Sequence, residues 1–105
     1  MAPEPVVIRV FAAPMAACGG SGQTWALAAA TLGQRLERRF GQMVSTEFVE
    51  LFSPRSFEFP GVLARIEAGG RLPLVTIGDD VITEGGKLSE PLLARALVER
   101  GLAAR

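Results

Sequence analysis

The chain has 105 residues, enough for one domain with its own apolar core, and we predict a single domain over residues 1–105. Eleven basic and eleven acidic residues give a formal net charge of zero, so no charge excess attracts nucleic acid or an anionic membrane. The absence of histidine excludes histidine-based catalysis, and the single cysteine, Cys18, excludes an intramolecular disulfide.

The first half of the chain alternates between strand and helix patterns. Val6–Ala12 is a nearly continuous apolar run with one arginine, which predicts a central strand buried on both faces. From about residue 23 to residue 40 the apolar positions recur at helical spacing, and Gly41 is a plausible stop. Alternation over 45–51 predicts a second strand, and Pro60 opens a short helix that ends at glycines 69 and 70.

The second half begins with a strand that starts at Pro73, because a proline cannot donate to a strand ladder. A tight turn over 78–80 returns the chain as a short strand through Val81 and Ile82, which predicts a hairpin. Ser89 can cap a last helix that closes at Gly101.

The order β-α-β-α-β-β-α predicts an α/β fold with a four-stranded mixed sheet and helices on both faces. We expect strands separated by helices to be parallel and joined by right-handed crossovers, and the final pair to be an antiparallel hairpin. This is the thioredoxin-like arrangement. A ferredoxin-like split βαβ fold would need the order β-α-β-β-α-β and an extra strand at the end.

Cys18 follows the first predicted strand and lies just ahead of the first helix. Unpaired amide groups and the positive end of a helix would stabilise its thiolate there, and thiolate content governs reactivity. The alternative is that Cys18 is a small, inert apolar residue under the loop. We also predict that the Leu72–Pro73 bond is cis, which would hold the Leu72 backbone open near Cys18.

Over nearly its whole length the chain resembles the thioredoxin superfamily. The run Cys18-Gly19-Gly20-Ser21 is similar to the cysteine-glycine-phenylalanine-serine motif of monothiol glutaredoxins, with glycine in place of phenylalanine. The resemblance implies a glutathione site formed by Cys18, Leu72, Pro73, Gly85 and Gly86. Glycines allow close backbone approach to a ligand, and Lys87 beside them would meet a carboxylate.

Two other small thioredoxin-like families show a resemblance. The helix end at 36–41 and the hairpin at 73–86 resemble the YuzD-like family of unknown function. Val10-Phe11, Pro14-Met15 and the run 66–82 are similar to ArsD-type arsenic metallochaperones and repressors. That family binds metalloid through cysteines just after the methionine, where this chain has Ala16 and Ala17.

These observations leave three functional hypotheses. The first is one-thiol exchange, in which Cys18 attacks a mixed disulfide of a substrate or partner protein, linked to glutathione in the simplest case, and an external thiol resolves the product. The second is binding of a soft metal or a cluster shared across a homodimer, since one thiolate cannot fill a coordination sphere. The third is an interaction domain without redox chemistry. We expect a cytoplasmic location, because no segment has the length of a membrane span and Met1–Pro5 does not resemble a signal peptide.

Overall fold

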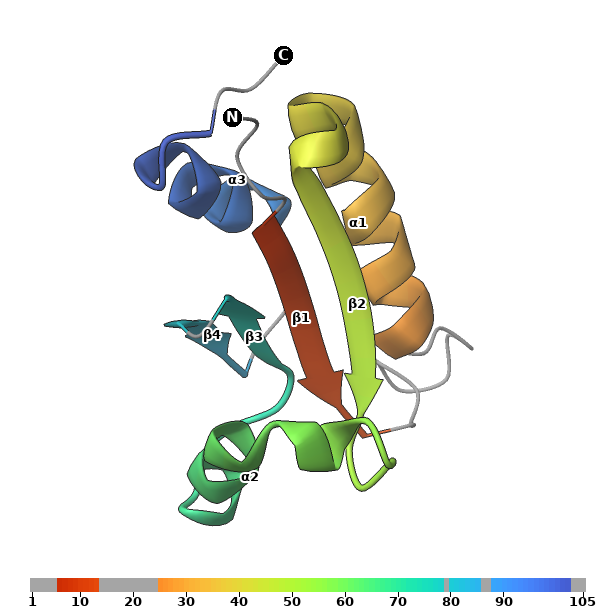
Figure 1. The fold of residues 1–105 in the computed structure, drawn as a ribbon, viewed down its shortest axis with the longest axis vertical. Coiled ribbons are helices and arrows are strands. Elements are labelled where there is room, and N and C mark those ends of the chain that lie inside the picture. Colours follow the sequence, from red (N-terminus) through yellow and green to blue (C-terminus); the bar gives the residue numbers. More distant parts are fainter. Residues whose placement is uncertain (1–5, 14–24, 79, 86–87, 103–105) are drawn as a thin grey trace.

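The computed structural model describes residues 6–13, 25–78, 80–85 and 88–102. The elements follow the predicted order (Figure 1). The strands are β1 (Val6–Ala12), β2 (Val44–Glu50), β3 (Leu74–Ile77) and β4 (Asp80–Glu84). The α-helices are α1 (Trp25–Phe40), α2 (Pro60–Glu67) and α3 (Glu90–Glu99), and two short 3-10 helices are η1 (Gly41–Met43) and η2 (Ser56–Glu58). None of the described helices is long and apolar enough to cross a membrane.

The four strands form one mixed sheet in the order β2-β1-β3-β4. β1 and β2 are parallel, with Val6 opposite Val44, and β3 and β4 form an antiparallel hairpin. β1 is a central strand, and Ile8, Val10 and Phe11 are fully buried in it. The predicted fold class is confirmed: the chain is an α/β protein with a thioredoxin-like layout and a four-stranded mixed sheet.

The expectation that every helix joins parallel strands is wrong for the connection through α2. β3 runs antiparallel to its neighbour β1, with Ile8 opposite Ile77. A parallel return must travel back along a seven-residue strand, roughly 23 Å, whereas the eight residues of α2 span only about 12 Å. In Figure 1, α2 lies at the end of the sheet where β2 stops. The chain therefore enters β3 from that same end.

Helices cover both faces of the sheet, as predicted. α1 and α3 share one apolar cluster with inward-facing residues of β1, β2 and β3, including Ile8, Val44 and Val75. α2 covers the other face, where Phe11, Leu51 and other buried residues form a smaller cluster. Because α2 contributes only half-buried side chains to it, this second cluster is the thinner of the two.

Local signals set the helix ends. The Ser89 hydroxyl accepts a hydrogen bond from the Leu92 N–H at 3.3 Å, which confirms the predicted cap of α3. Pro60 occupies the first turn of α2, where its missing N–H costs no helical hydrogen bond. Gly41 adopts a φ of 67° directly after α1, a conformation in which glycine carries no steric penalty.

Candidate functional site

The structure covers half of the predicted site. It describes Leu72, Pro73 and Gly85, whereas Cys18, Gly86 and Lys87 lie outside the described residues. The Leu72–Pro73 peptide bond is cis, as predicted. The approach of Cys18 to Leu72 stays a prediction.

The Leu72 backbone lies just outside the sheet ladder. β3 begins at Leu74, and Pro73 between them is fully buried. The Leu72 side chain packs against the cluster beneath α2. No hydrogen bond joins the backbone of Leu72 to any other residue that the structure describes. Among the described residues its N–H and C=O thus have no partner, and these are the two groups with which an added strand pairs.

This open backbone lies at the end of β1 from which the chain continues towards Cys18. Phe11 is the register partner of Leu74, so antiparallel pairing brings Ala12 beside Pro73. Cys18 follows Ala12 by six positions in the sequence. The fold thus places the exit of β1 and the Leu72–Pro73 segment at the same end of the sheet.

Gly85 continues the pairing of the hairpin and packs against Arg71. Its N–H donates to the Pro73 carbonyl at 2.9 Å, and its φ is 75°. A Cβ atom added to Gly85 would lie 3.0 Å from the Cβ of Arg71, closer than carbon atoms normally pack. Glycine is therefore required here by both its backbone conformation and its neighbour. The close approach predicted for a ligand is, among the described residues, made by the stem of Arg71.

Arg71 is the site residue that sequence reasoning missed. It is exposed, directly precedes Leu72 and forms no ion pair with any described residue. The neighbouring charges are compensated, because Arg65 of α2 pairs with Glu84 of β4. Arg71 therefore gives the described part of the site an uncompensated positive charge, which favours an anionic ligand. Its position directly before Leu72 and Pro73 is the one feature of the sequence that indicates a role for Arg71 in the site.

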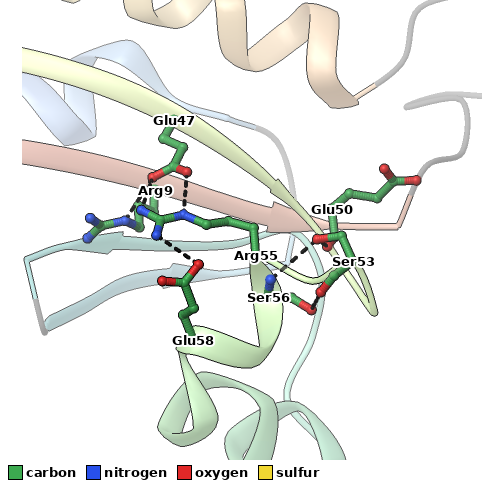
Figure 2. Close-up of polar contacts among 7 residues, drawn as sticks. All are labelled: Arg9, Glu47, Glu50, Ser53, Arg55, Ser56 and Glu58. Carbon is green, nitrogen blue, oxygen red and sulfur yellow. Dashed lines mark hydrogen bonds and ion pairs between the residues drawn. The ribbon is translucent and has the colours of Figure 1, made fainter.

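A cluster of polar side chains centred on Glu47 lies on the α2 face of the sheet (Figure 2). Arg55 donates to both carboxylate oxygens of Glu47, at 2.8 and 3.1 Å, and Arg9 donates to one at 3.0 Å. Arg55 also pairs with Glu58 at 3.1 Å. Both guanidinium groups lie about 5 Å from the ring centre of Phe59. These contacts fasten the segment between β2 and α2 to the sheet.

The same contacts shift the ionisation of Glu47. The hydrogen bonds from Arg55 lower the pKa of Glu47 below its ordinary value of 4.5, and the one from Arg9 lowers it further, against an opposing effect of burial. The pKa of Arg55 is raised by its hydrogen bonds to Glu47 and Glu58. Among the described residues, no three His, Cys, Asp or Glu side chains form a group that could hold a metal ion.

No protein-family model matches the chain, and no curated protein sequence does. Two solved structures share its fold. One is the crystal structure of a protein of unknown function from Staphylococcus aureus, with a TM-score of 0.70 and 16% identity over 91% of each chain. The other, described as the structure of a malarial protein, has a TM-score of 0.54 and 19% identity over 95% of this chain and 100% of its own. At these identities the likeness concerns the fold alone.

Proposed function

We propose that the protein catalyses one-thiol disulfide exchange through Cys18, with glutathione as the simplest partner. The Cys18 thiolate attacks the glutathione sulfur of a mixed disulfide between glutathione and a partner thiol, a new disulfide forms, and the partner thiolate leaves with the electron pair of the broken bond. A free glutathione thiolate then attacks the glutathione sulfur of the Cys18 mixed disulfide, which forms oxidised glutathione and releases the Cys18 thiolate. Each step needs only one protein cysteine.

The observation that carries the proposal is the Leu72 backbone at the end of β1, which pairs with no residue that the structure describes. Glutathione is a short extended peptide, so its backbone can pair with an open edge of this kind. Arg71 supports the proposal as an uncompensated cation beside that edge, suited to a glutathione carboxylate. Gly86 and Lys87 remain predicted parts of the same site.

Intact-mass spectrometry tests the proposal. Protein purified without oxygen and incubated with oxidised glutathione should gain the mass of one glutathione, and Cys18→Ser should gain none. The proposal fails if the native protein stays unmodified. It also fails if the purified protein is a coloured dimer that loses both colour and dimer in Cys18→Ser, because that result would indicate a shared metal or cluster.

The charge of Arg71 gives a sharper test. Arg71→Gln should slow formation of the glutathione adduct by about tenfold, the effect of losing one charge-assisted contact. Arg95→Gln is the matched control, because Arg95 is exposed on α3 and also lacks an ion pair with any described residue. Equal rates for the two variants would show that Arg71 does not bind glutathione.

A further inference from the structure

Two phenylalanine side chains in the segment between β2 and α2 are exposed to solvent. Phe52 is 73% exposed and Phe57 is 60% exposed. A third, Phe59, points inward instead, and its ring meets that of Phe11 edge-on at 5.3 Å. The two outer rings therefore contribute little to the core, and aromatic side chains in this position are typical of binding surfaces.

Phe52 is held in an unfavourable backbone conformation. Its φ is 64°, in the left-handed region that costs energy for a residue with a Cβ atom. Hydrogen bonds on either side fix this turn: the Ser53 N–H and hydroxyl donate to the Glu50 carbonyl, and the buried Ser56 donates back to Ser53 (Figure 2). Strain of this kind persists where surrounding contacts determine the conformation, and it is concentrated at functional sites. The ring is thus presented on a fixed loop, which lowers the entropy cost of binding.

This loop is attached to the end of β1 that leads towards Cys18. The N–H of Leu51, directly before Phe52, donates to the Ala12 carbonyl at 3.0 Å. In Figure 1 the connection between β2 and α2 lies at the end of the sheet where β1 stops. The loop and the Leu72–Pro73 segment therefore lie at the same end of the sheet.

Near the two exposed rings, Glu50 at the end of β2 has a negative charge that no described residue compensates. Glu47 and Glu58 are both paired with Arg55, whereas Glu50 is exposed and forms no ion pair with a described residue. Figure 2 shows the Glu50 carboxylate directed away from the cluster around Glu47. Two apolar rings and one carboxylate complement an apolar segment that also carries a basic side chain.

We propose that Glu50, Phe52 and Phe57 form a docking surface for protein disulfide substrates of Cys18, and that the surface binds an apolar segment with a lysine or arginine next to the reacting cysteine. The inference rests on the proposed thiol exchange and names its substrate class. Glutathione has no apolar side chain to place on the two rings, so the surface distinguishes a protein disulfide from glutathione.

The test measures the rate of one exchange step. Two short peptides each carry one cysteine joined to thionitrobenzoate by a disulfide. Leucine and arginine flank this cysteine in one peptide, and serine and glutamate flank it in the other. Glutathione joined to thionitrobenzoate in the same way is the reference. The Cys18 thiolate attacks the peptide sulfur, the new disulfide forms as the old one breaks, and the coloured thionitrobenzoate leaves with the electron pair. Native protein should react with the leucine–arginine peptide about tenfold faster than with the serine–glutamate peptide.

The double variant Phe52→Gly with Phe57→Ala should lose this preference and keep the native rate with the glutathione reference. Glycine suits the φ of 64°, so the variant should fold, and denaturant unfolding verifies this. Val98→Ala is the matched control, because Val98 is an exposed apolar residue on α3. It should keep the full preference.

Any one of the following results would overturn the docking surface. The native protein could show no preference between the peptides, or the folded double variant could keep the preference. A native dimer that the double variant abolishes would identify a second copy as the occupant. A native protein that reacts with neither peptides nor the glutathione reference would refute the proposed function as well, whereas reaction with glutathione alone would refute only the docking surface.

Discussion

Gly33→Ala should destabilise the protein, although helix propensity alone predicts that alanine in place of a glycine inside a helix would stabilise it. Gly33 is buried within α1, facing Thr46 of β2. An added Cβ would lie 2.9 Å from the Thr46 Cβ and 3.1 Å from its Oγ1, whereas carbon atoms pack favourably at about 3.5–4.0 Å. The Thr46 Cβ is fixed by the β2 backbone, so the clash can be relieved only by moving α1 away from the sheet.

Two opposing effects decide the size of the change. Replacing glycine by alanine inside a helix gains about 1 kcal/mol of helix propensity. Overpacking a buried contact costs about 1–3 kcal/mol, and here the whole helix must shift. We expect Gly33→Ala to lower the free energy of unfolding by about 1 kcal/mol, measured by denaturant unfolding.

Gly61→Ala in α2 is the matched control. Its added Cβ would meet nothing within 4 Å, so only the backbone effect remains and stability should rise by about 0.5 kcal/mol. If Gly33→Ala also raised stability, the close packing of α1 on β2 would be refuted.

Three other changes test separate contacts, all by equilibrium unfolding. Thr46→Val should stabilise by about 1 kcal/mol, because the buried Thr46 Oγ1 has no hydrogen-bond partner among the described residues; a loss of stability would mean that the hydroxyl is satisfied. Glu47→Gln should lower the free energy of unfolding above about pH 4.5. A carboxylate whose pKa is lowered in the folded state adds stability that is lost as pH falls through the lowered value, so the difference should shrink in acid. A native-to-variant difference that grows in acid would contradict this sign. Phe52→Gly should stabilise by up to about 1 kcal/mol through relief of the left-handed backbone, whereas a clear loss would show that the ring packs.

The sequence predicted the elements of the fold well because their signals are local. The apolar run of β1, the proline at the start of α2 and the capping Ser89 each act within a few residues. The direction of β3 could not be read in this way. A hydrophobic pattern shows that a strand exists, and its direction depends on where the short helix α2 delivers the chain.

The candidate site was only partly predictable for a related reason. The cis bond before Pro73 has a local signal, the X-Pro sequence. The importance of Arg71 depends on which other charges are already paired, and the Arg65–Glu84 pair joins residues 19 positions apart. Phe52 itself carries no such signal, because the hydrogen bonds of its neighbours Ser53 and Ser56 fix the turn that holds it in the left-handed conformation.

The unequal packing of the two sheet faces has a consequence for motion. α1 buries Leu32, Leu36 and Phe40, whereas α2 has no fully buried residue. Local opening should therefore require less free energy at α2 than at α1, so the amide hydrogens of α2 should exchange with solvent well before those of α1. Only residues 68–71 separate α2 from Leu72. The open edge proposed to receive a ligand thus follows a helix that opens more readily than α1, and a ligand bound there would slow exchange in α2.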